Sequence, residues 1–116
     1  MENNDFKESP MSMHTTVMET YNKFLDLKDE IEIAFIRLNV VELGFLEGQY
    51  FNIRNDMTHN IQWMEQICQD CVNKNSVTEV SEPLAEARNW GVKVGKYYQI
   101  LVCYKNGIAR RAIVTR

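Results

Sequence analysis

The last thirty residues of the chain, 87–116, contain no Asp or Glu. All sixteen acidic residues therefore lie in residues 1–86, which carry six of the thirteen Lys and Arg residues and a balance of −10. Residues 87–116 carry the other seven basic residues and a balance of +7. Such a split is informative about partners rather than about fold, because it points to a basic end that meets an opposite charge.

The sequence also lacks any apolar run close to the roughly 20 residues that a membrane-spanning helix needs. Its first ten residues, MENNDFKESP, have neither the basic start nor the apolar centre of a secretory signal. We therefore expect a cytoplasmic, intracellular protein with no membrane partner. A length of 116 residues with 45% apolar residues suits one folded domain with a modest core.

Cysteine is scarce, and its odd number, three, argues against a closed disulfide framework. Cys68 and Cys71 form the motif CQDC, but a redox motif of this type should open a helix after a strand, whereas CQDC lies late in a predicted helix. A zinc site needs further ligands, and only Cys103, His14 and His59 remain, scattered along the chain. We expect no metal and no cofactor.

Catalytic motifs are missing as well. The sequence has no nucleophile elbow, no phosphate-binding loop and no paired-histidine metal motif. Acidic pairs such as Asp29-Glu30 are typical of the solvated surface of a helix. The sequence therefore predicts a binding protein rather than an enzyme.

What the chain does contain is an acidic first part with a helical pattern. Thr16 and Glu19 have the spacing of a capping box at a helix start. The apolar residues that follow are separated mostly by alternating steps of four and three, as on one helix face: Val17, Tyr21, Phe24, Ile31, Phe35, Leu38 and Phe45. Residues 30–41 also alternate as a strand does, so a strand remains the alternative for this segment. Gly44 and Gly48 indicate a bend, a helix end or a close crossing.

A second helix is predicted to begin near Asp56 or Thr58, either of which can cap it, and to end before the polar run after Val72. A linker follows, with a short helical turn that starts at Ser81 and places Pro83 in its first turn.

Asn106-Gly107 separates two β-prone runs in the basic end, which is a strong short-range pattern for a β-hairpin. Val92-Lys93-Val94 is a possible third strand. The predicted fold class is therefore α+β, with long N-terminal helices in a hairpin or bundle and a small C-terminal antiparallel sheet. The predicted organisation is a disordered tail at 1–11 and a single domain at 12–116, divided into an acidic helical part (12–74), a linker with a short helix (75–91) and a basic β unit (92–116).

Three uses of the basic end remain open. It can bind an acidic surface of a protein partner, contact nucleic acid, or neutralise the acidic helices of its own chain or of a second copy. We expect a small non-catalytic regulator, inhibitor or adaptor that binds a protein, with a nucleic-acid-binding regulator as the alternative. A further variant is that the acidic helices mimic nucleic acid. The candidate binding residues are Lys96, Tyr98, Tyr104, Lys105, Arg110, Arg111 and Arg116.

Self-association is expected as well. The predicted hairpin has apolar residues on both faces, and the helical stripe is interrupted by Lys28 and Glu42. A single chain would then leave apolar surface uncovered, which favours a homodimer.

Overall fold

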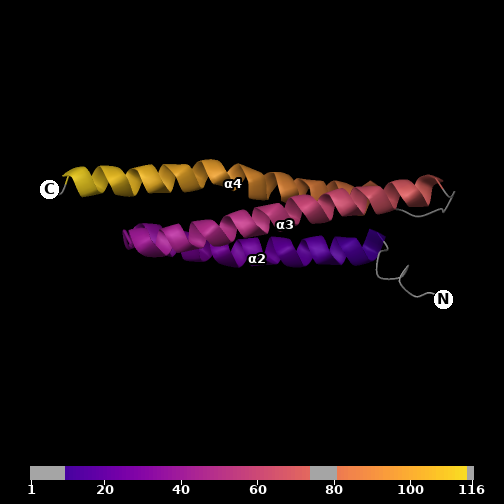
Figure 1. Ribbon diagram of the computed structural model, residues 1–116, viewed down its shortest axis with the longest axis horizontal. Coiled ribbons are helices and arrows are strands. Elements are labelled where there is room, and N and C mark those ends of the chain that lie inside the picture. Colours follow the sequence, from indigo (N-terminus) through magenta and orange to yellow (C-terminus); the bar gives the residue numbers. More distant parts are fainter. Residues whose placement is uncertain (1–9, 74–80, 115–116) are drawn as a thin grey trace.

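The chain folds as an elongated bundle of three long helices in the computed structural model, which describes residues 10–73 and 81–114 (Figure 1). The helices are α2 (Pro10–Ile36), α3 (Val40–Asn73) and α4 (Ser81–Val114). Helices α2 and α4 run in the same direction, and α3 runs antiparallel to both. The molecule measures 66 × 23 × 15 Å, so it is a rod rather than a sphere.

The core is built from residues at alternating steps of three and four along each helix. This spacing keeps one stripe of a helix on its partners and is typical of coiled-coil packing. In α2 the buried stripe is Met13, Val17, Thr20, Phe24, Leu27, Ile31 and Ala34. In α4 it is Ala87, Val94, Tyr97, Leu101 and Ile108, with Trp90 and Tyr104 partly buried at the intervening positions.

The predicted C-terminal β unit is wrong, and with it the α+β class. The described residues contain no strand, and α4 continues through Asn106-Gly107 to Val114. Gly107 serves close packing instead of a turn, because a Cβ there would lie 3.3 Å from the Phe35 ring. The apolar residues that were placed on both faces of the predicted hairpin belong to one helix. Its buried stripe follows the helical period of about 3.6 residues and not the two-residue period of a strand.

The predicted helix boundaries also need correction. Helix α2 begins at Pro10, so Thr16 lies inside it, where its hydroxyl donates to the Ser12 carbonyl oxygen at 3.2 Å. Helix α3 runs without a break past Asp56, and Gly44 and Gly48 lie within it. The preferred helical prediction for residues 30–41 is confirmed up to Ile36, where α2 ends, and the strand alternative is wrong. Helix α4 begins at Ser81 with Pro83 in its first turn.

The connection between α2 and α3 is three residues long. The Asn39 amide donates to the Ala34 carbonyl and the Leu38 amide donates to the Phe35 carbonyl, which together form a Schellman C-cap. The Asn39 side chain then accepts from the Glu42 amide at 3.0 Å and caps α3. These bonds satisfy the exposed ends of both helices within one tight turn.

Candidate docking surfaces

The basic residues of α4 fall into two groups. Arg88 pairs with Glu65 at 2.9 Å and Lys105 pairs with Glu47 at 3.0 Å, and both acidic partners lie on α3. Lys93, Lys96 and Arg110 are exposed, and no ion pair among the described residues includes them. The basic end is therefore neutralised in part by its own chain and remains basic on the outer side of α4.

The outer side of α4 also carries apolar side chains. Val92 is 50% exposed and Ile100 is 44% exposed, and they lie four residues before and after Lys96. A step of four residues keeps side chains on one face of a helix. We call this set, Val92, Lys93, Lys96, Ile100 and Arg110, the α4 ridge. It combines apolar contact area with positive charge that no carboxylate of α4 offsets after Glu86.

The predicted binding residues are only partly brought together by this arrangement. Lys96 and Arg110 lie on the ridge, whereas Lys105 is directed to α3 by its ion pair. Tyr104 stacks on Phe35 with ring centroids 4.3 Å apart, and Tyr98 lies 5.8 Å from the Phe51 ring. Arg111 lies on α4, but its side chain is outside the described part of the structure, as is the whole of Arg116.

Aromatic residues of α4 contact other aromatic and charged side chains of the bundle. Trp90 stacks on Tyr21 with ring centroids 5.5 Å apart and lies 5.2 Å from the His14 ring. His14 also contacts Glu86 at 2.8 Å, which joins the N-terminal parts of α2 and α4. The guanidinium of Arg54 lies 5.7 Å from the Tyr98 ring centroid. These contacts leave the α4 ridge without a free aromatic face from this group.

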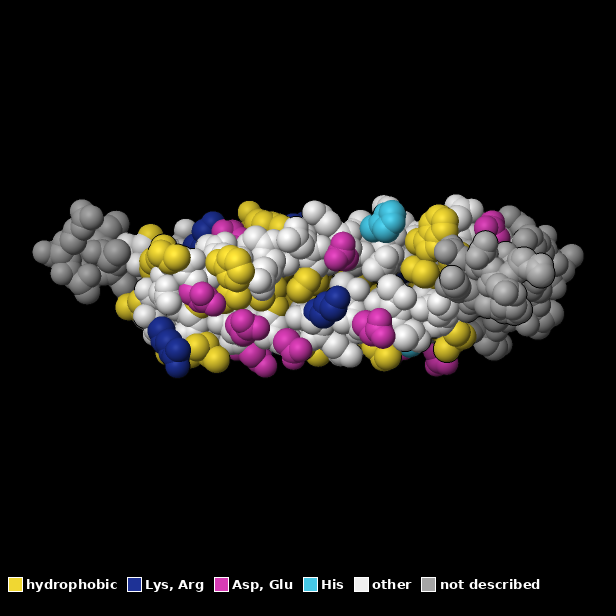
Figure 2. Space-filling view, turned by 60° about the horizontal axis from the view of Figure 1, so that its bottom comes forward, with side chains coloured by type: hydrophobic (Ala, Val, Ile, Leu, Met, Phe, Trp, Pro, Cys, Tyr) yellow, Lys and Arg dark blue, Asp and Glu magenta, His cyan; other side chains and the backbone are white. Residues whose placement is uncertain are grey.

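A second surface was missed by the sequence analysis. Five apolar residues at or next to the α2–α3 turn are between 43% and 84% exposed, and we call them the apolar tip: Ile36, Leu38, Val40, Val41 and Phe45. Figure 2 shows apolar side chains at the surface of this end, beside side chains of both charges. Leu38 and Phe45 had been assigned to a buried stripe. The adjacent pair Val40-Val41 was the available clue, because neighbouring helical residues differ in direction by about 100° and a narrow core stripe seldom buries both of them.

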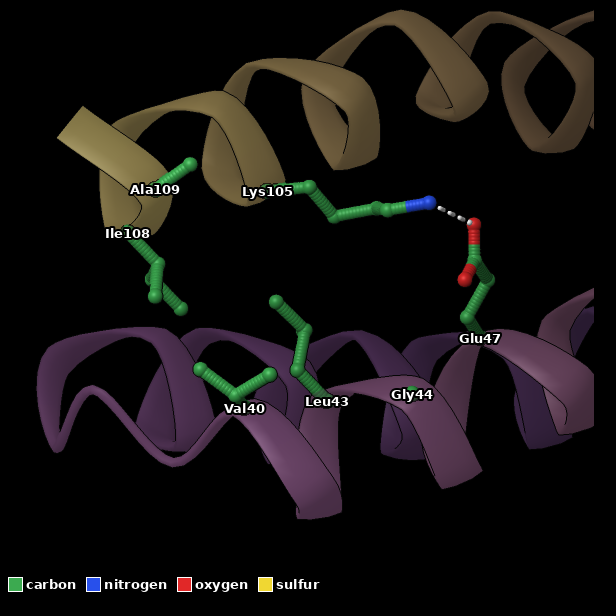
Figure 3. Close-up of a pocket in the computed structure, with 7 residues that line it drawn as sticks. All are labelled: Val40, Leu43, Gly44, Glu47, Lys105, Ile108 and Ala109. Atoms are coloured by element: carbon green, nitrogen blue, oxygen red, sulfur yellow. Dashed lines mark hydrogen bonds and ion pairs between the residues drawn. The ribbon is translucent and has the colours of Figure 1, made fainter. Parts of the chain in front are cut away.

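An apolar groove lies beside the tip, between α3 and α4 (Figure 3). It has a volume of about 240 Å³, and its apolar lining is Val40, Leu43, Gly44, Ile108 and Ala109. The Glu47–Lys105 ion pair spans from α3 to α4 at one end of it. Gly44 leaves the wall open, since no atom lies within 4 Å of the position that its Cβ would occupy.

The described residues contain neither a cluster of metal-ligating side chains nor a helix that could span a membrane. No group of three or more His, Cys, Asp and Glu side chains there is arranged to hold a metal ion. No helix within residues 10–73 and 81–114 is both long and apolar enough to cross a bilayer. Cys68 is buried, and Cys103 is an exposed free thiol. The side chain of Cys71 lies outside the described residues, so the CQDC motif is described only at Cys68.

Comparison of the chain with known protein families, with curated protein sequences and with solved structures found no match in any of the three. The function is therefore inferred from the surfaces described above.

Proposed function

We propose that the protein is a non-catalytic binding protein, a regulator or adaptor, which docks on an acidic protein surface through the α4 ridge. The observation that supports this most directly is the exposure of Lys93, Lys96 and Arg110 without a carboxylate partner among the described residues. Charged groups of this kind steer encounter and select partners of opposite sign. Val92 and Ile100 supply the apolar area from which affinity comes.

A protein partner accounts for the ridge better than nucleic acid does. Binding to single strands uses aromatic side chains on which bases stack. In this bundle Trp90 and Tyr104 stack on aromatic residues of α2, and the acidic side chains of α3 lie close to α4. The remaining cations can contact an acidic protein surface without base stacking.

The exposed thiol of Cys103 supports an intracellular location as part of the same proposal. This cysteine is free and lies at the surface of α4. Exposed free thiols persist where glutathione and thioredoxin keep cysteines reduced.

The test places a photoreactive side chain at Gln99, which is exposed next to the ridge and whose replacement removes no charge. A matched control carries the same group at Gln62, which is exposed on α3. In cells that express the protein, we expect Gln99 to crosslink to acid-rich protein segments. The double change Lys93→Glu and Lys96→Glu should reduce this crosslink by about tenfold or more, because it replaces attraction by like-charge repulsion. Crosslinks to nucleic acid, or equal crosslinking at Gln99 and Gln62, would contradict the proposal.

A further inference from the structure

The apolar tip has the size of surface patches that often bind a partner. Its five side chains expose an area on the order of 500 Å², which is the size of the largest apolar patch on a typical monomer, and such patches are often functional. Val41, at 84% exposed, and Ile36, at 72%, protrude furthest into solvent. The tip therefore behaves as a projecting apolar contact surface.

The turn itself gives independent support. Leu38 has a φ of 56°, in the left-handed region that the C′ position of a Schellman motif requires and that glycine normally fills. A residue with a Cβ is strained in this region by roughly 1–2 kcal/mol. Leu38 is 43% exposed, so its side chain is only partly buried by its own chain. Strain kept at an exposed apolar residue is typical of a functional position.

The groove between α3 and α4 complements the tip. Its walls come from Val40, Leu43 and Ile108, and Gly44 leaves space in the wall (Figure 3). A volume of about 240 Å³ holds one or two large apolar side chains. Helix α4 extends past the α2–α3 turn, so the tip and the groove lie together at the end of the rod where α4 terminates (Figure 1).

We propose that the occupant of this end is a second copy of the chain, packed tip to tip about a twofold axis. A twofold interface uses the same patch on both subunits, so a patch that has both a projection and a hollow can be complementary to itself. This end contains both, and each copy can insert tip residues into the groove of the other. The tip, with the groove walls added to it, supplies more than half of the roughly 800 Å² that each partner contributes to a stable interface.

The charges beside the α2–α3 turn fit a second copy better than a strongly charged partner. Arg37 in the turn and Glu42 in the first turn of α3 are both exposed, whereas Arg110 lies on the outer side of α4. Because Arg37 and Glu42 carry opposite charges, they do not make two copies repel each other. A twofold arrangement allows Arg37 of each copy to meet Glu42 of the other. The surface therefore selects by apolar shape, whereas the α4 ridge selects by charge.

The dimer extends the function of the bundle. Tip-to-tip packing places one α4 ridge on each half of a rod approaching twice the 66 Å length of a single chain. Two identical ridges on one particle bind a repeated acidic partner with avidity. This inference depends on the tip and the groove and not on the ridge, so either proposal can fail without the other.

Sedimentation equilibrium of the purified chain up to about 100 μM tests self-association, because the population of a dimer depends on protomer concentration. We expect a mass of twice 13.6 kDa for the native chain. The change Phe45→Glu should weaken the dimer at least tenfold, because it places a charge in an apolar contact. Trp63→Glu is the matched control, since Trp63 is an exposed aromatic residue on α3 far from the tip, and it should leave the dimer intact. Small-angle X-ray scattering should give a maximum dimension well above 66 Å.

A second variant separates loss of contact from loss of folding. Gly44→Leu fills the groove from within, and because Gly44 lies in a helix with open space beside it, the change should not destabilise the chain. It should abolish the dimer, whereas Gly48→Leu, also in open space on α3 but outside the groove, should preserve it. A monomeric native chain, a dimer no longer than one rod, or a dimer that tolerates both Phe45→Glu and Gly44→Leu would overturn the proposal.

Discussion

Replacing either of two core tyrosines with phenylalanine removes one oxygen atom, yet we expect the two changes to shift stability in opposite directions. Tyr50 on α3 and Tyr97 on α4 are both buried, with ring centroids 6.0 Å apart. The Tyr50 hydroxyl donates to the backbone oxygen of Val94 at 2.6 Å. The Tyr97 hydroxyl is buried, and no hydrogen-bond partner for it occurs among the described residues.

The size of each effect follows from this difference. Tyr50→Phe loses one buried hydrogen bond, worth about 1 kcal/mol of unfolding free energy. Tyr97→Phe removes a hydroxyl that is desolvated without a partner, a penalty of about 1–3 kcal/mol, so we expect a gain of about 1 kcal/mol after the lost packing of the oxygen. The two variants should therefore differ by about 2 kcal/mol, although both rings keep their contacts with Phe24.

Denaturant unfolding followed by far-ultraviolet circular dichroism measures both values, at a concentration where one oligomeric state dominates. In thermal melts, 1 kcal/mol corresponds to a shift of about 4 °C for a chain of this size. The change in unfolding free energy of the double variant should lie near the sum of the two single changes. Any difference from that sum measures the coupling between the two side chains. If Tyr97→Phe destabilises the chain by as much as Tyr50→Phe, the Tyr97 hydroxyl has a partner and the reasoning is wrong.

Two further predictions concern pH and the turn. Burial, with smaller contributions from Tyr104, Glu32 and Asp29, raises the pKa of Tyr97 above its ordinary value of 10.0. Because Tyr97 then ionises at lower pH in the unfolded chain than in the folded chain, the unfolding free energy does not depend on this group below pH 10 and falls above it, by up to about 1.4 kcal/mol per pH unit. Thermal melts from pH 9 to 11 should show a smaller decrease in stability for Tyr97→Phe than for the native chain. An equal decrease in both would contradict this prediction. Leu38→Gly should raise the unfolding free energy of the monomer by up to about 1 kcal/mol through relief of backbone strain while weakening the dimer, and a less stable monomer would show that side-chain packing outweighs the strain.

Sequence periodicity predicted the core of α2 well. Val17, Phe24 and Ile31 were placed on one helix face and are buried there. The predicted stripe continued past the end of the helix, however, since Leu38 lies in the turn and Phe45 is exposed. The helix ends at a Schellman turn that uses leucine where glycine is usual, so the residue that normally reports such a turn is absent.

The error in the basic end has a similar origin. Asn106-Gly107 and the β-branched residues before it favour a hairpin when only neighbours are considered. The stripe of α4 becomes decisive only when α2 and α3 are present to cover it, because tertiary packing overrides local propensity. Gly107 illustrates this dependence, since the Phe35 ring that it packs against is 72 residues away in sequence.

The basic residues of α4 now divide into two groups. Glu47 and Glu65 are eighteen residues apart on α3, and their partners Lys105 and Arg88 are seventeen apart on α4 in the reverse order, so both pairs fit one antiparallel register. Exposed pairs of this kind contribute only about 0–1 kcal/mol each, but a slip of one helix past the other would break both. These two cations therefore specify alignment between α3 and α4. Lys93, Lys96 and Arg110 contribute nothing to that register, which is why we assign them, and not the whole acid-free end, to the partner.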